Sequence, residues 1–495
     1  MNRGGGSRSV KVLFLASEVA PFAKTGGLAD VAGSLPGALK RLGAEVSIGL
    51  PLYRVVKERA QERQVVLRGL NVPVAGQTLK ANVQAAETEE GVPVYFFERE
   101  DLYDRPNLYR TAEGDYYDNL ERFAFFSRGA LLFAKTAGIS FDVIHCHDWQ
   151  TGLVPAYLRT LFRADPFFAS AATLFTIHNI GYQGLFPGDK LSVCGLPPET
   201  YQPEGVEYWG AISLLKAGIV YSDAVTTVSP KYSMEIQTPE FGMGMEGILR
   251  KRSAVLHGIL NGADYSVWNP VTDPYIVSPY DGEHCTEKRV NKAALLKETG
   301  LDPALLERPV LGMISRLSNQ KGCDLLIPIL DEIAKMDLGL VVLGEGEEHY
   351  ENALREAAEK YEGRVFLNIG FDDALAHRIM AGADLLLVPS LYEPCGLTQM
   401  YAMKYGTVPV VRATGGLDDT VEEFDARTKG GNGFKFGPYD PRAFLAAIER
   451  AVTLFADEET WEALRRSGMA ADFSWEVSAE RYLELYQSLA LRKRG

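Results

Sequence analysis

A glycine loop with the sequence KTGGLAD places Lys24 and Asp30 on either side of Gly26 and Gly27. The glycines let backbone N–H groups approach a diphosphate or a sugar closely, and Lys24 supplies a positive charge. Asp30 falls in the first turn of a helix expected over residues 29–41, where a carboxylate suits the helix dipole. A tight turn with a solvated lysine has the same composition, so this loop alone indicates ligand binding only weakly.

A second basic loop contains Arg316 and Lys321 and precedes an apolar run, Cys323–Asp331, that predicts a helix. A guanidinium binds oxyanions through paired N–H groups and an ammonium is a compact charge, a combination that neutralises a departing diphosphate. Two solvated charges beside a turn are the ordinary alternative. The two basic loops occupy corresponding positions in the two halves of the chain, which favours the functional interpretation.

The stretch from Pro389 to Tyr401 has the most specific pattern, because Pro394 and Gly396 shape a loop around Glu393. Its N–H groups and carboxylate can bind sugar hydroxyls, and a helix starting near Leu397 would direct its positive end at phosphate. A helix-capping role is the alternative for the carboxylate. Another glycine turn, after the next predicted strand, consists of Thr414, Gly415 and Gly416.

Histidines mark two further strand ends. His145 and His147, followed by Asp148, could ligate a metal because alternate strand residues share a face. No further ligand cluster is visible, so we expect histidines bonded to protein groups rather than a metal site. His178 beside Asn179 suits polar contacts to a sugar, with a buried core histidine as the alternative.

The elements that position these loops follow from apolar, β-branched runs that alternate with helical patterns, which predicts parallel sheets covered by helices on both faces. Ligands bind beyond the carboxyl ends of such strands. We therefore expect an α/β chain with two doubly wound, Rossmann-like domains facing across a cleft. The predicted divisions are an N-terminal domain over 1–255, a C-terminal nucleotide-sugar-binding domain over 256–471, and a helix over 472–495 that crosses back to the first. The predicted strands lie at 11–17, 45–49, 92–97, 142–147, 173–177 and 224–228, then at 309–314, 340–344, 364–368, 384–390 and 407–411.

Composition narrows the class of protein. A chain of 495 residues exceeds what one core usually supports, and 46% hydrophobic with 23% charged residues is a globular balance. A net charge of -14 argues against nucleic acid as a partner but not against a neutral polymer.

Five cysteines without a CxxC pair favour a reducing compartment, and we expect a cytoplasmic protein without a membrane partner. Residues 1–8 lack the apolar core of a signal peptide and are expected to form a flexible leader.

Taken together, these segments resemble the bacterial glycogen synthase and plant starch synthase family, glycosyltransferase family 5, which has the GT-B fold. The likeness covers nearly the whole chain. The segments that carry it are KTGGLADV from Lys24, LYDRP from Leu102, YDNLERF from Tyr117, HDW from His147, SLLKAG from Ser213, NGAD from Asn261, SRLSNQKG from Ser315, EPCGLTQ from Glu393 and TGGLDDT from Thr414.

The resemblance implies a retaining transfer of glucose from ADP-glucose to the non-reducing end of an α-1,4-glucan, without a metal or other cofactor. It implies that Arg316 and Lys321 hold the diphosphate and that Glu393 and His178 contact the glucose. These four would be the catalytic residues. The remaining residues implied to bind substrate are Lys24, Gly26, Gly27, Asp30, Tyr103, Asp148, Asn179, Asn261, Gly370 and Phe371 near the adenine, Cys395, Gly396, Leu397, Thr398, Thr414, Gly415 and Gly416.

One position departs from the wider fold group, in which a second glutamate eight residues after the first often binds ribose. That position is Tyr401 here, as in the synthase family, so the ribose contact stays unassigned. Three alternatives remain open: an inactive glucan-binding protein on the same fold, another retaining sugar-nucleotide transferase, and a phosphorylase that uses pyridoxal phosphate. A nicotinamide dehydrogenase is disfavoured because the segment from Gly344 to Gly346 lacks the third glycine of the dinucleotide fingerprint.

Overall fold

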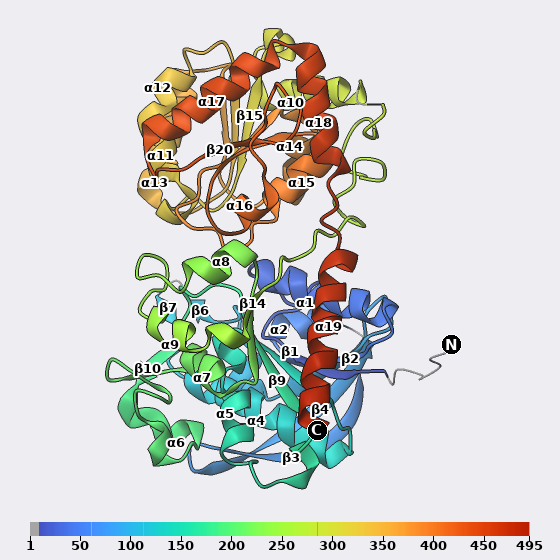
Figure 1. The fold of residues 1–495 in the computed structure, drawn as a ribbon, viewed down its shortest axis with the longest axis vertical. Coiled ribbons are helices and arrows are strands. Elements are labelled where there is room, and N and C mark those ends of the chain that lie inside the picture. Colours follow the sequence, from blue (N-terminus) through green and yellow to red (C-terminus); the bar gives the residue numbers. More distant parts are fainter. Residues whose placement is uncertain (1–8, 61, 112, 285, 495) are drawn as a thin grey trace. The chain divides into compact units, whose positions relative to one another are not determined.

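A computed structural model describes residues 9–60, 62–111, 113–284 and 286–494 (Figure 1), so the expected leader over 1–8 lies outside the described residues. These residues form two compact units. The first contains the chain up to Val228, Ser233–Gly262 and the segment from Trp475, and the second contains Ser229–Tyr232 and Ala263–Ser474. The structure thus divides the chain at Gly262, slightly later than the predicted 255, and groups the C-terminal segment with the first unit.

The first unit is built on a nine-stranded sheet in the order β14-β13-β9-β8-β1-β2-β5-β4-β3. Neighbours from β14 to β5 are parallel, and β5, β4 and β3 pair antiparallel. The predicted parallel strands are present, whereas the β3–β4 hairpin was not predicted because its largely exposed residues interrupt any apolar run. The strands are β1 Lys11–Leu15, β2 Glu45–Pro51, β3 Gln64–Val74, β4 Gln77–Glu87, β5 Pro93–Glu98, β8 Val143–His147, β9 Ala172–Ile177, β13 Ala224–Thr227 and β14 Leu256–Gly258.

Helices and short strands complete the first unit. The first helix, α1 Gly27–Arg41, buries Val31, Leu35 and Leu39 at helical spacing and carries its acidic residue in the first turn and basic residues in the last. The other helices are α2 Arg54–Arg59, α3 Glu100–Tyr103, α4 Asn119–Ala137, α5 Leu153–Arg159, α6 Leu191–Cys194, α7 Leu214–Tyr221, α9 Glu246–Lys251 and α19 Trp475–Arg494. A further helix, α8 Pro230–Glu235, begins in the second unit and ends in the first. The short strands are β6 Arg110–Thr111 with β7 Gly114–Asp115, and β10 Leu185–Pro187 with β12 Ala211–Ser213 and β11 Glu207–Tyr208.

The second unit has a six-stranded, wholly parallel sheet in the order β17-β16-β15-β18-β19-β20. The helix predicted over Cys323–Asp331 is instead two short helices joined by a 3₁₀ turn at Pro328, which has no N–H to continue the helix. The strands are β15 Val310–Ile314, β16 Gly339–Leu343, β17 Val365–Asn368, β18 Leu385–Val388, β19 Val408–Arg412 and β20 Phe434–Phe436. The helices are α10 Glu287–Thr299, α11 Cys323–Leu326, α12 Leu330–Ile333, α13 Glu348–Lys360, α14 Asp373–Gly382, α15 Thr398–Lys404, α16 Gly415–Thr420, α17 Pro441–Phe455 and α18 Glu458–Ala470.

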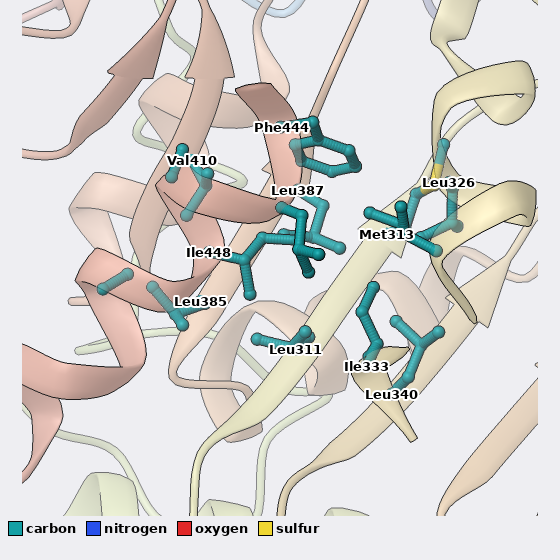
Figure 2. Close-up of a cluster of buried hydrophobic side chains, with 14 of the residues drawn as sticks. Leu311, Met313, Leu326, Ile333, Leu340, Leu385, Leu387, Val410, Phe444 and Ile448 are labelled. Atoms are coloured by element: carbon teal, nitrogen blue, oxygen red, sulfur yellow. The ribbon is translucent and has the colours of Figure 1, made fainter. Parts of the chain in front are cut away.

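Both faces of this second sheet are buried. Figure 2 shows Leu311 and Met313 of β15 in one cluster with Phe444 and Ile448 of α17. Val310, which points to the opposite face because strand side chains alternate, belongs to a separate cluster with residues of α10 and α14. Burial on two faces explains why these strands read as continuous apolar runs in the sequence.

The C-terminal helix α19 packs against α1 of the first unit. Glu476 forms an ion pair with Arg41 at 2.7 Å, and the buried Tyr486 hydroxyl lies 2.7 Å from Nδ1 of His145 on β8. Within the described part of the chain, no helix combines the length and apolarity needed to span a bilayer.

We predict that Tyr486→Ala lowers the free energy of unfolding by about 3–5 kcal/mol, because it leaves a cavity and removes the partner of His145. Tyr486→Phe keeps the ring and should cost about 1 kcal/mol. Denaturant unfolding of the intact chain measures both, with Leu491→Ala as control, since Leu491 is 68% exposed on the same helix. Equal midpoints for Tyr486→Ala and Leu491→Ala would contradict the packing role of α19.

Candidate active site

The loop after β1 is organised by a buried carboxylate. Glu18 accepts hydrogen bonds from the backbone N–H of Thr25 and of Gly26, the latter at 3.1 Å, and from the Thr25 hydroxyl at 2.6 Å. The hydroxyl of Tyr109 donates to the same carboxylate at 2.8 Å. These bonds satisfy a charge that would otherwise be costly to bury, and they fix the backbone that leads into α1.

Gly26 and Gly27, at the start of α1, are exposed, and a Cβ built on either would meet no atom within 4 Å. The N-terminal end of this 15-residue helix is therefore open, and its role in binding an oxyanion stays a prediction. Lys24 is 48% exposed and forms an ion pair with Asp30 at 2.6 Å. In the structure Asp30 thus orients the lysine in addition to lying in the first helical turn.

Strands β8 and β9 bring His147 and His178 together, with Nδ1 of His147 2.9 Å from Nε2 of His178. Burial lowers the pKa of His178 to about 3 and holds the pKa of His147 well below its ordinary value. Both rings are therefore neutral near pH 7, so one nitrogen of the pair donates to the other. His178 can offer a substrate a neutral polar contact but no charge.

The structure gives His145 protein partners rather than a metal. Its two ring nitrogens lie 2.7 Å from the Tyr486 hydroxyl and 2.6 Å from the Thr176 hydroxyl. In residues 9–494, leaving aside 61, 112 and 285, no group of three or more His, Cys, Asp or Glu side chains is placed to hold a metal ion.

Asp148 holds the His178 loop. Its carboxylate accepts the backbone N–H of His178 at 2.7 Å and also that of Asn179. Asp148 itself has φ of 54°, an unfavourable value for a residue with a side chain, and burial raises its pKa to about 7. The structure therefore shows Asp148, predicted to bind substrate, supporting the backbone of two other predicted site residues.

Tyr103 was predicted to bind substrate, but the structure places it in the core. Its side chain is fully buried, its hydroxyl donates to the carbonyl of Arg122 at 2.6 Å, and its ring packs on Tyr53. No surface of Tyr103 is left for a ligand, so its role is packing. Asn261 is also buried, next to Gly262, where a Cβ would lie 2.5 Å from Cα of Trp475.

In the second unit, two predicted catalytic residues meet. Nζ of Lys321, in the loop after β15, lies 2.6 Å from Oε2 of Glu393, in the loop after β18. Ser390 donates to the same Oε2 at 2.9 Å. None of the described residues donates a hydrogen bond to Oε1 of Glu393, so this oxygen can accept from a ligand hydroxyl. The pair is largely buried, which fixes the lysine in one direction.

Arg316 lies in the same loop as Lys321 and is exposed. Its guanidinium donates to Gln320 at 3.3 Å. The loop turns through Gly322, whose φ of 79° suits glycine and whose Cβ, if present, would lie 2.3 Å from the carbonyl oxygen of Pro389. This close approach brings Lys321 beside the Glu393 loop and leaves Arg316 facing solvent as the more accessible cation.

The predicted phosphate turn at Thr414, Gly415 and Gly416 packs against the Glu393 loop. A Cβ on Gly415 would lie 1.9 Å from the carbonyl oxygen of Glu393, and one on Gly416 would lie 2.0 Å from that of Cys395. The amide of Gly416 donates to the carbonyl of Glu393 at 3.1 Å, and that of Thr414 donates to the carbonyl of Arg412 at 2.9 Å. These two amides are therefore committed within the protein, and the glycines serve backbone packing.

The remaining predicted contacts lie around α15 and the loop after β17. Cys395 is buried, Gly396 has φ of 71°, Leu397 precedes the helix and Thr398 is its first residue. Gly370 follows β17 with φ of 129°, and the ring of Phe371 is 84% exposed.

Tyr401, the position without the second glutamate, is buried and stacks on Trp268 with ring centroids 4.5 Å apart. His377 also stacks on Trp268, with ring centroids 3.8 Å apart. The aromatic residue thus belongs to a packed ring cluster, which gives a structural reason for its presence there.

The sequence interpretation missed Glu18, Tyr109 and Ser390, the residues that position the predicted ones. Glu18 lies three residues after the end of β1, at the carboxyl edge where ligands bind, and this position was the available indication. Ser390 carries the same indication, since it lies two residues after β18, whereas the importance of Tyr109 depends on the residue it meets.

Comparison with known proteins finds relatives along nearly the whole chain. A family model for the starch synthase catalytic domain matches residues 11–251, and one for group 1 glycosyl transferases matches residues 303–467. The chain is 46% identical over 476 residues to a glycogen synthase of Koribacter versatilis, covering 96% of this chain and 97% of that protein. It is 46% identical over 478 residues to a glycogen synthase of Syntrophotalea carbinolica, covering 97% and 98%.

Two solved structures are similar. The catalytic domain of starch synthase IV from Arabidopsis thaliana matches with a TM-score of 0.88 and 35% identity, covering 97% of this chain and 99% of that one. Sucrose-phosphate synthase from Thermosynechococcus elongatus matches with a TM-score of 0.58 and 19% identity over 97% and 99%, a likeness of fold alone. The match to starch synthase IV over nearly the whole of both chains confirms the expected GT-B fold. With 46% identity to two glycogen synthases over nearly its full length, the chain belongs to the glycogen synthase and starch synthase family of glycosyltransferases.

Proposed function

We propose that this chain transfers glucose from ADP-glucose to the non-reducing end of an α-1,4-glucan with retention of configuration and without a metal or other cofactor. Membership of the synthase family supports the reaction class. The cytoplasmic location stays a prediction from the cysteine pattern.

The observation that carries the proposal is the contact between Lys321 and Glu393 at 2.6 Å. The loop that contains Lys321 also contains the exposed Arg316. Two cations held at the carboxyl ends of parallel strands suit a departing diphosphate, because preorganised charges stabilise charge that develops in the transition state. Oε1 of Glu393 is placed to accept from a glucose hydroxyl. The same few residues thus combine leaving-group and sugar recognition.

Two observations favour an adenine nucleotide and a glucan. The starch synthase IV structure was obtained with ADP and acarbose bound. In this chain Phe371 offers an exposed aromatic face beside Gly370, suited to stacking on a nucleobase.

Retention without a double displacement is the route that these residues favour. Glu393 is bound to Lys321 and Ser390, and Asp148 accepts two backbone N–H groups, so we assign neither as a nucleophile on the sugar. In a front-face reaction the bond between C1 and the diphosphate oxygen breaks while O4 of the acceptor bonds to C1 on the same side. The O4 proton passes to the diphosphate. Positioned cations then supply most of the stabilisation.

Release of ADP from ADP-glucose in the presence of glycogen tests the function directly. We expect release that requires both substrates and is slower with UDP-glucose, measured by a coupled assay for the nucleoside diphosphate. No release with either donor would favour an inactive glucan-binding protein. A bound-aldehyde absorption band in the purified protein would instead indicate a phosphorylase.

Lys321→Ala should lower the rate of ADP release by roughly 10²-fold or more, the scale of a lost transition-state donor. Lys360→Ala is the matched control, since Lys360 is an exposed lysine of the same unit in an ion pair with Asp331 at 2.8 Å. Circular dichroism checks that both variants fold. Near-normal turnover by folded Lys321→Ala would refute the role of this cation.

Glu18→Gln should raise KM for ADP-glucose by roughly tenfold with a smaller change in kcat, because the loop amides contact the donor equally before and during reaction. The glutamine oxygen can still accept the N–H groups of Thr25 and Gly26, but its NH2 group cannot accept from the hydroxyls of Thr25 and Tyr109, and loss of the negative charge weakens the bonds that remain. Steady-state kinetics measures the split, with the exposed Glu89→Gln as control. Unchanged KM would show that the loop does not need this carboxylate.

A further inference from the structure

Trp209 combines two features that folding does not explain. Its side chain is 87% exposed, and its backbone has φ of 51°, in the left-handed region. Exposure leaves a large apolar surface in water, and a left-handed conformation is unfavourable for a bulky residue. Within the described residues its one ring neighbour is Tyr208, with centroids 6.5 Å apart.

The turn that holds Trp209 would suit other residues better. Trp209 and Gly210 form the two-residue loop of the hairpin β11–β12, in which Tyr208 pairs with Ala211, and Gly210 has φ of 82°. Two-residue hairpin loops with positive φ at both positions favour Asn-Gly, because these residues tolerate the left-handed region. A tryptophan in the first position therefore indicates selection for its side chain rather than for the turn.

The hairpin is a rigid support. The carbonyl of Gly210 accepts from the Tyr201 hydroxyl at 2.9 Å, and its N–H donates to Glu207 at 2.8 Å. The buried Lys216 donates to the carbonyl of Glu207. A side chain presented on such a base has little freedom left to lose on binding a ligand.

The hairpin is continuous with the loop that carries His178. The carbonyl of Met243 accepts both from the Tyr208 hydroxyl at 2.8 Å and from Nε2 of Gln183 at 2.9 Å. At the other end of β12, the Ser213 hydroxyl donates to the carbonyl of Gln183 at 3.1 Å. Ser213 thus contacts the loop that carries His178, and Trp209 lies just before the other end of β12.

Another exposed aromatic lies on the His178 loop itself. Tyr182 is 53% exposed, and its backbone N–H donates to the carbonyl of Asn179 at 3.2 Å. Met243 is also exposed, and its carbonyl joins the segments that carry Tyr182 and Trp209 through the bonds to Gln183 and Tyr208. Exposed large apolar side chains on segments held in this way are available to a ligand.

We infer that Trp209 is a stacking platform for a glucose ring of an α-1,4-glucan, beyond the sugar units that react. The inference rests on the proposed function, which supplies a neutral polymer as the ligand. The flat indole face suits the C–H groups on one face of a pyranose, and a net charge of -14 does not repel an uncharged chain.

Native electrophoresis in gels containing glycogen tests the platform. Trp209→Ala and Trp209→Asn should raise the apparent dissociation constant for glycogen about tenfold, the scale of a lost aromatic contact. Trp209→Phe should restore much of the retardation, and Leu491→Ala, which removes an exposed apolar side chain from α19, should match the wild type. Trp209→Asn should melt at or above the wild-type temperature because asparagine suits the turn, so its weaker binding would not reflect unfolding.

Assays of ADP release separate this inference from the proposed function. With maltotriose, too short to reach beyond the reacting sugars, Trp209→Ala should match the wild type, whereas with dilute glycogen it should be slower. Equal glycogen retardation of wild type and Trp209→Ala, or no retardation of the wild type, would overturn the platform even when ADP release is normal. Absence of ADP release by the wild type with every acceptor, alongside glycogen retardation that depends on Trp209, would overturn the proposed reaction and leave the platform standing.

Discussion

Backbone-to-backbone packing between loops sets the geometry of the second unit's site. A Cβ at Gly322 would lie 2.3 Å from the carbonyl oxygen of Pro389, and one at Gly415 would lie 1.9 Å from that of Glu393. Only glycine allows loops after β15, β18 and β19 to approach this closely. The contact between Lys321 and Glu393 depends on that approach, so packing of the protein itself holds the cation beside the carboxylate. Preorganisation of this kind is what electrostatic catalysis requires.

The first unit holds its loops by different means. The charge of Glu18 is buried and satisfied by N–H and O–H donors, whereas His147 and His178 are kept neutral by burial. The result is a surface of open helix N–H groups and neutral polar side chains. Lys24, which forms an ion pair with Asp30 at 2.6 Å, is an exposed cation of the same unit.

Much of the fold could be predicted because parallel strands are buried on both faces. Strands such as β15 and β18 appear in the sequence as unbroken apolar runs, and each predicted run overlaps an observed strand. The hairpin β3–β4 could not be found in this way, since many of its residues face solvent. The single helix predicted over Cys323–Asp331 is interrupted by a 3₁₀ turn at Pro328. The apolar pattern does not reveal this, because the interruption follows from the missing N–H of proline.

The sequence by itself determined the kind of protein, because glycines, cations and carboxylates at strand ends recur in an order that identifies the family. It could not determine which of these residues touch. Lys321 meets Glu393 from 72 positions away, and Tyr109 reaches Glu18 from 91. The burial of Tyr103 and the commitment of the Gly416 amide to Glu393 likewise appear only when distant segments pack. Residue type sets what chemistry a position can offer, and long-range packing decides which partner or solvent each group faces.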